Sequence, residues 1–294
     1  MTQSTLHTQR PSLPSHPPPA PRRAPPDKRP PPRRVRAQAG LILALWLLGT
    51  PGGVYGKADA IGYAVCHRIA DRSFHVDGRP LPLCARCTGI YMGAMSSLAV
   101  LVAARRGRAS RLPPNRVLVA LGAFVVLMGL DGINSYLYLF PGYVGPYQPQ
   151  NWLRLLTGSF TGIALIHLLF PIFNALAWQR PAPQRPLNSL AELAGMLAVV
   201  GLVDTLILLQ NPTLLLAFGL VSAAGPLIVL TMVWTALFLS LTRRENAARS
   251  WRDLALPLVA GLALTFLMIG SIDTVRFLLT GTWEGFDFSA LARP

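Results

Sequence analysis

Seven long apolar segments constrain this chain more than any other feature of its sequence. A helix needs roughly 20 mostly apolar residues to cross the hydrocarbon core of a bilayer. The segments lie at about residues 39–55, 88–104, 117–140, 152–178, 189–209, 214–241 and 254–279. This pattern predicts an all-α, polytopic transmembrane bundle of about seven helices. The number falls to six if the first segment, which Pro51, Gly52 and Gly53 interrupt, does not span.

The composition excludes an ordinary soluble domain. Only 13% of the residues are charged and the mean hydropathy is +0.42, whereas a soluble domain carries about 25% charged residues. The net charge of +15 would suit a nucleic-acid-binding protein, but the basic residues lie between apolar segments and in the N-terminal tail, without interleaved aromatic residues. We therefore expect the lipid bilayer, and no nucleic acid, as the partner; the sequence indicates no protein partner.

The distribution of Lys and Arg predicts the orientation of the helices. Nineteen of the 27 basic residues lie in the N-terminal tail and in the loops at 105–116, 179–188 and 242–253, whereas six lie on the opposite side. Because basic residues are retained on the cytoplasmic side of a membrane, the N-terminus is predicted to be cytoplasmic. The loop at 56–87 and the C-terminal tail at 282–294 then lie outside.

Three regions follow from this pattern. Residues 1–38 form a Pro- and Arg-rich tail that has few apolar side chains to bury, so we expect it to be disordered in the cytoplasm. The helical membrane domain is expected at 39–281, and the short external tail follows it.

All three cysteines lie in the external loop at 56–87. Cys84 and Cys87 have the two-residue gap that suits a metal site or a redox dithiol, and Cys66 is followed by His67. Three interpretations stay open. In the first, Cys66, Cys84 and Cys87 with His67 or His75 bind a zinc-like metal ion. In the second, Cys84 and Cys87 form a disulfide or redox pair with Cys66 as a third, resolving thiol. In the third, the cysteines only staple or pack the loop. The sequence identifies no catalytic residue and leaves open whether the protein is an enzyme.

Ionisable residues within the predicted spans indicate a second part of the site, because such groups are costly in a membrane and usually functional. Each is expected in the outer half of its helix, beneath the cysteine loop. We therefore predict a polar pocket that opens outward, with structural ion pairs between helices as the alternative. The residues are Asp131, Arg154, Asp204, Asp273 and Arg276.

The cysteine loop and the two helices after it resemble the family called domain of unknown function 2085. The residues that carry the resemblance are Cys66-His67, Arg72-Ser73-Phe74, Leu81 to Gly93 with the two cysteines, Asp131-Gly132, Asn151 and Arg154 to Gly158. The similar region, 66–162, covers about a third of the chain. The resemblance implies a multi-pass protein of a prokaryotic plasma membrane and implies no activity.

Together these observations predict an integral membrane protein with an extracytoplasmic Cys/His cluster, metal-binding or thiol-redox, above a polar intramembrane pocket. The alternatives are a structural or assembly protein whose cysteines only fix the loop, and a transporter of ions or small solutes that uses the intramembrane acids.

Overall fold

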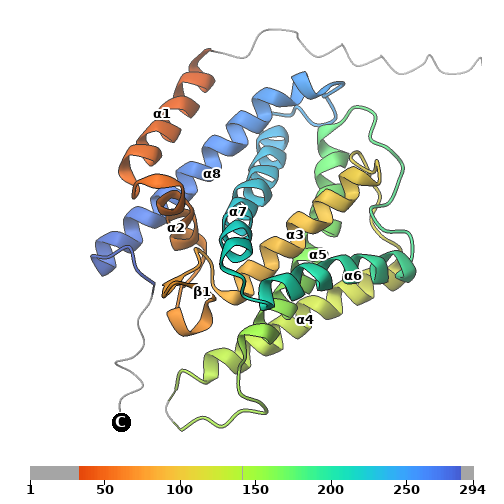
Figure 1. Cartoon of the computed structure of the whole chain (residues 1–294). Coiled ribbons are helices and arrows are strands. Elements are labelled where there is room, and N and C mark those ends of the chain that lie inside the picture. The colour runs from red at the N-terminus through yellow and green to blue at the C-terminus, as the bar shows by residue number, and fades with distance from the viewer. Residues whose placement is uncertain (1–32, 141, 286–294) are drawn as a thin grey trace, which may run out of the picture. The chain divides into compact units, whose positions relative to one another are not determined.

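The computed structural model describes residues 33–140 and 142–285, and these residues are mostly helical (Figure 1). They contain eight α-helices, one 3₁₀ turn, η1 (Ala70–Arg72), and a two-stranded hairpin of β1 (His75–Val76) and β2 (Arg79–Pro80). The helices are α1 (Arg33–Gly49), α2 (Gly53–Val65), α3 (Ala85–Ala103), α4 (Asn115–Leu137), α5 (Asn151–Ala177), α6 (Leu190–Leu208), α7 (Pro212–Leu241) and α8 (Trp251–Thr280).

The predicted helical bundle is confirmed. Helices α3 to α8 are long and apolar enough to cross a membrane, and α1 with α2 makes a seventh candidate if the bent pair counts as one span. Many large apolar side chains on these helices are exposed, such as Val125, Val126 and Leu127 on α4. Such a surface suits contact with lipid, since the membrane interior requires no polar coat.

The first apolar segment differs from its prediction. Helix α1 begins at Arg33, within the segment assigned to the tail, and ends at Gly49; residues 1–32 of that predicted tail lie outside the described residues. Helix α2 then starts at Gly53, bent by 105° from α1, so residues 56–65 are helical and do not form a loop. Pro51 lacks a backbone donor and Gly53 adopts a φ of +75°, which together explain the break.

Helices α3 and α5 pack backbone to backbone in the part of the bundle that supports the cysteines. A Cβ atom at Gly89 would lie 2.1 Å from the carbonyl oxygen of Leu155, and one at Gly162 would lie 2.0 Å from that of Ile90. Only glycine allows this approach, as in other close crossings of membrane helices. The small residues of α3 therefore serve helix packing.

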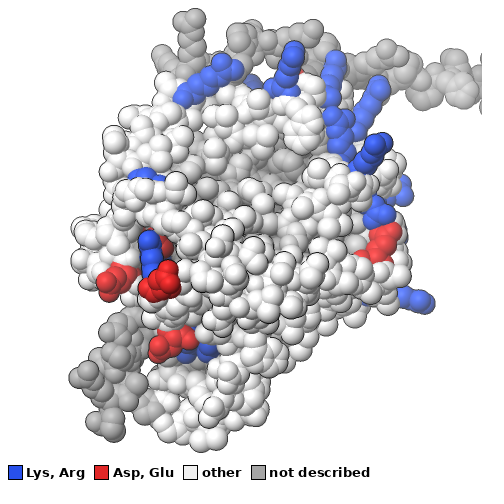
Figure 2. Space-filling model, viewed as in Figure 1, with Lys and Arg blue, Asp and Glu red and all other residues white. Residues whose placement is uncertain are grey.

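The remaining helices flank this pair. Helix α1 lies along α8, where Trp46 and Phe266 are in ring contact with centroids 4.8 Å apart (Figure 1). Figure 2 shows Lys and Arg side chains gathered along the upper and right-hand edges, whereas most of the Asp and Glu side chains visible in this view lie toward the lower left. The basic residues are thus unevenly distributed in space as well as along the sequence.

Candidate functional site

The three cysteines come together where α2 ends and α3 begins. Cys66 is the residue after α2, Cys84 is the residue before α3, and Cys87 lies in the first turn of α3. Their Sγ atoms all lie within 4.8 Å of one another, with Cys66 and Cys84 buried and Cys87 partly buried. The structure therefore unites the cysteines identified from the sequence, and their chemistry stays a prediction.

The meeting of α2 and α3 depends on one close backbone contact. Gly62 packs against Pro82, and a Cβ atom at Gly62 would lie 1.9 Å from the carbonyl oxygen of Pro82. The hairpin between the helices returns the chain to this point, where the N–H of Leu81 donates to the carbonyl oxygen of Phe74 at 2.9 Å. Cys66 and Cys84 are thereby brought together although they are far apart in the sequence.

Backbone amides fix the position of one sulfur in the cluster, and neighbouring side chains shift the pKa values of the thiols. The N–H groups of Arg68 and Cys84 both donate to Cys66 Sγ at 3.4 Å, which fixes the position of that sulfur. Hydrogen bonds from Cys66, Cys87 and His67 hold the pKa of Cys84 well below its usual range. The hydrogen bond of Cys66 to Cys84 in turn raises the pKa of Cys66 to about 12. Like charges this close oppose one another, so three thiolates require a cation.

His67 lies beside the cluster. Its Nδ1 accepts a hydrogen bond from the N–H of Ile69 at 3.1 Å. Among the described residues, the group of Cys, His, Asp and Glu side chains close enough to share one ion here consists of Cys66, Cys84 and Cys87. In this conformation His67 therefore lies outside the group of sulfur atoms, where it helps to lower the pKa of Cys84.

Arg276 of α8 holds the segment that carries Cys66. Its guanidinium donates to the carbonyl oxygens of Tyr63 at 2.5 Å, Cys66 at 2.7 Å and His67 at 3.2 Å, and lies 4.0 Å from the ring centroid of Tyr63. The last carbonyls of a helix lack partners within the helix, so Arg276 satisfies the end of α2. Asp273, one turn earlier, accepts a hydrogen bond from Trp46 of α1 at 3.3 Å.

We expect Arg276→Gln to lower the free energy of unfolding by about 2–4 kcal/mol, because buried carbonyl groups would lose a charged donor. Cys66 should also react faster with a thiol reagent, because its segment would be less well held. Thermal unfolding and timed labelling in detergent measure the two effects. Arg252→Gln, at the opposite exposed end of α8, is the matched control; equal behaviour of the two variants would contradict this role for Arg276.

Asp131 has a partner that sequence reasoning missed. Its carboxylate forms an ion pair with Arg86, one of the two residues between Cys84 and Cys87, and accepts a hydrogen bond from the Tyr147 hydroxyl at 3.0 Å. Arg86 also donates to the Ser135 hydroxyl at 3.2 Å, and Arg72 donates to the carbonyl oxygen of the same serine at 2.7 Å. Burial and the nearby Arg86 lower the pKa of Arg72. The cysteine loop is thus attached to α4 by arginines.

Two of the other predicted pocket residues have local partners. Arg154 donates to the side-chain oxygen of Asn151 at 2.8 Å, one turn earlier in α5. Asp204 of α6 is buried and accepts a hydrogen bond from the Ser159 hydroxyl of α5 at 2.8 Å. No direct ion pair joins Asp131 to Arg154 among the described residues.

The five intramembrane residues have different neighbours among the described residues. Asp273 lines a pocket between α1 and α8, and Arg276 lines another together with Cys66 and His67. Asp131 and Asp204 are buried and contact residues of α3 and α5. A polar pocket shared by all five stays a prediction.

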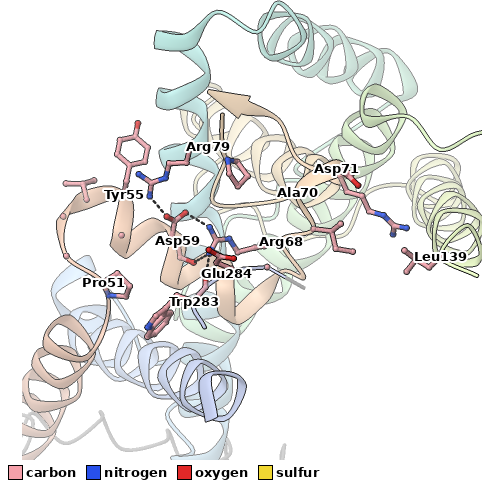
Figure 3. A pocket seen from close by; sticks show the side chains of 18 of the residues that line it. Pro51, Tyr55, Asp59, Arg68, Ala70, Asp71, Arg79, Leu139, Trp283 and Glu284 are labelled. Carbon is pink, nitrogen blue, oxygen red and sulfur yellow. Dashed lines mark hydrogen bonds and ion pairs between the residues drawn. The ribbon is translucent and has the colours of Figure 1, made fainter. Parts of the chain in front are cut away.

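A cavity of about 1200 Å³ lies beside the cluster (Figure 3). Asp59 of α2 is placed between Arg68, at 2.9 Å, and Arg79, and Arg68 also donates to the carbonyl oxygen of Trp283 at 3.1 Å. Arg68 joins the cavity to the cluster, since its side chain lines the first and its N–H contacts Cys66 Sγ. No sequence pattern indicates this network directly, because Asp59 lies in the segment expected to be a loop and is in fact helical.

One known family covers the cysteine region. The sequence pattern of a family described as predicted membrane proteins (DUF2085) matches residues 66–168. This range contains the three cysteines, Arg86, Asp131 and Arg154 and ends within α5, so α6 to α8 lie outside it.

Two archaeal proteins match the same part of the chain. An uncharacterized protein of Methanothermobacter thermautotrophicus is 35% identical over 103 residues, which are 34% of this chain and 80% of the relative. An uncharacterized protein of Methanocaldococcus jannaschii is 25% identical over 121 residues, which are 41% of this chain and 71% of the relative. No solved structure matches the chain.

Proposed function

The chain belongs to the DUF2085 family of predicted membrane proteins, and we propose that it binds a soft metal ion through Cys66, Cys84 and Cys87 on the outer face of a prokaryotic plasma membrane. The observation that carries this proposal is the convergence of three sulfur atoms within 4.8 Å of one another, at the junction of two helices.

The spacing and the chemistry of the donors fit such an ion. With Zn–S bonds of about 2.3 Å, two sulfurs on a tetrahedral ion lie about 3.8 Å apart, so the cluster needs only a small contraction. Thiolates favour zinc and monovalent copper over hard cations. When bound, the ion would supply the positive charge that lets all three thiols ionise together. Arg72 and Arg86 add positive charge next to the cluster.

The orientation is supported by the basic residues. The loops at 105–116, 179–188 and 242–253 join the ends of spans that lie away from the cluster. Retention of these loops in the cytoplasm would place the cysteines outside. Arg68 would then lie between the cluster and a cavity open to the outer solvent.

A thiol-redox function is the second candidate, because the lowered pKa of Cys84 is the property of an attacking thiol in a Cys-x-x-Cys pair. In that case Cys84 and Cys87 would alternate between dithiol and disulfide without a resident ion. The structural and transport alternatives gain less support, since Asp131 forms an ion pair with Arg86, and Asp204 and Asp273 each accept a hydrogen bond from a different helix.

Metal analysis of the purified protein tests the proposal. We expect about one soft metal ion per chain after purification in mild detergent, and protection of the three thiols from a thiol reagent until a chelator is added. Three freely reactive thiols without metal would contradict metal binding. One reactive thiol with a reducible disulfide would instead support the redox function.

Labelling of intact cells tests the orientation separately. After gentle reduction and chelation, a membrane-impermeant thiol reagent is expected to label these cysteines. Labelling that requires permeabilised cells would place the cluster in the cytoplasm while leaving the metal result valid.

A further inference from the structure

A second pocket lies at the basic end of the bundle, away from the cysteines. It has a volume of about 510 Å³ and is lined by the loop after α3 and the loop before α6. Its polar lining residues are Arg105, Arg106, Arg111, Arg185, Gln184 and Asn188. Four guanidinium groups therefore surround one concave site at the membrane boundary.

Backbone hydrogen bonds hold the two loops of this pocket together. The N–H of Ser110 donates to the carbonyl oxygen of Ala182 at 3.2 Å, and the N–H of Arg111 donates to that of Gln184 at 3.1 Å. The Asn174 side chain of α5 anchors the first loop by donating to the carbonyl oxygen of Ala109 at 3.0 Å. The arginines are thus attached to a fixed backbone and not to a free loop.

Most of the positive charge in the pocket is uncompensated. Glu192 neutralises Arg106 through contacts of 2.5 and 2.9 Å. The side chains of Arg105, Arg111 and Arg185 make no hydrogen bond or ion pair with any residue in 33–140 or 142–285. Retention of basic loops in the cytoplasm explains the presence of arginines on this side. It does not require three unpaired arginines to face the same hollow.

The surroundings indicate a lipid rather than a soluble anion. The pocket lies at the end of α3 and the start of α6, the level at which a headgroup meets the hydrocarbon. Exposed Val102, Leu112 and Leu190 lie beside the lining residues in the sequence and would suit acyl chains. Guanidinium groups bind phosphate oxygens in pairs, and basic pockets between membrane helices on the cytoplasmic side bind anionic headgroups.

We propose that Arg105, Arg111 and Arg185 bind the phosphate group of an anionic phospholipid at the basic end of the bundle. This site is independent of the thiol cluster. It would fix the α3–α6 side of the bundle to the leaflet and make the stability of the protein depend on lipid composition.

Native mass spectrometry with added lipid tests the proposal. We compare cardiolipin and phosphatidylglycerol with phosphatidylcholine, using the full chain in detergent. The pocket variant carries Arg105→Gln, Arg111→Gln and Arg185→Gln. The control carries Arg243→Gln, Arg244→Gln and Arg252→Gln. These three arginines are exposed and lie after α7 and at the start of α8. The match is close because Arg105 and Arg243 both follow a span with a positive φ, of 56° and 53°.

The expected result is anionic-lipid binding that weakens by roughly 10- to 100-fold in the pocket variant and stays near the wild-type value in the control. Equal loss in both variants, or no preference for anionic lipid, would overturn the proposal. Binding of inorganic phosphate that displaces the lipid would assign the site to a soluble anion and overturn the lipid proposal. If the triple variant does not fold, Arg185→Gln alone is compared with Arg244→Gln, with the same expected direction.

Discussion

Replacing Gly162 by alanine is expected to remove most of the folded protein from membranes. A Cβ atom at this position would lie 2.0 Å from the carbonyl oxygen of Ile90 and 2.7 Å from the backbone nitrogen of Ala94. These are backbone atoms of α3, so no rotamer change relieves the clash. Overpacking costs about 1–3 kcal/mol where side chains can yield, and we expect the upper end or more here. The amount of protein that mild detergent extracts from membranes and that stays soluble on heating measures the effect.

The matched control is Gly129→Ala in α4. Gly129 is also within a predicted span, but a Cβ atom there would have no atom within 4 Å. Alanine should be neutral or stabilising by about 0.5–1 kcal/mol, because glycine weakens a helix interior by that amount. If Gly162→Ala is as abundant and as stable as Gly129→Ala, the α3–α5 crossing does not require glycine at position 162.

Replacing Cys84 by serine is expected to lower the bound metal to below about one tenth of the wild-type amount. A serine oxygen is a hard, protonated donor and is a poor substitute for thiolate on zinc or copper. Cys84 is central to the cluster because its Sγ lies within 4.8 Å of both other cysteine sulfurs and its neighbours hold its pKa well below the usual range. Metal content per folded chain, measured by elemental analysis, gives the result directly.

Thr88→Ser serves as the control for Cys84→Ser. Thr88 is buried one turn into α3 and its hydroxyl donates to the carbonyl oxygen of Leu83 at 3.2 Å, a bond that serine preserves. The control should bind metal like the wild type. Full metal content in Cys84→Ser would contradict the proposed site, whereas an unfolded Cys84→Ser protein from metal-free cells would support cysteines that only staple the loop.

The positions of the later spans could be predicted closely from the sequence. The segments expected at 214–241 and 254–279 correspond to α7 (Pro212–Leu241) and α8 (Trp251–Thr280). These spans can be predicted because each one is a single continuous run of apolar residues, and bilayer thickness sets the length of that run. Helix α2 was missed because it has only 13 residues and many Gly and Ala, too few apolar side chains to mark a span.

The candidate site was predictable only where its residues lie close in the sequence. The spacing of Cys84 and Cys87 implies that their sulfurs face one point, and Cys66, which the sequence also marks as a candidate, lies with them in the structure. The partners of the intramembrane charges were not predictable in this way. Asp131 pairs with Arg86 of another helix, and Arg276 turns to the carbonyls of α2, because these choices depend on how helices cross in space.

The contacts of Arg276 make the C-terminal helix part of the cysteine centre. The family match ends at residue 168, yet a guanidinium more than a hundred residues later closes the end of the helix that presents Cys66. A fragment that stops after the matched region would therefore contain all three cysteines but lack the guanidinium that holds the segment of Cys66. In this chain, a helix outside the family match therefore acts as an internal brace for the cysteine-bearing segment.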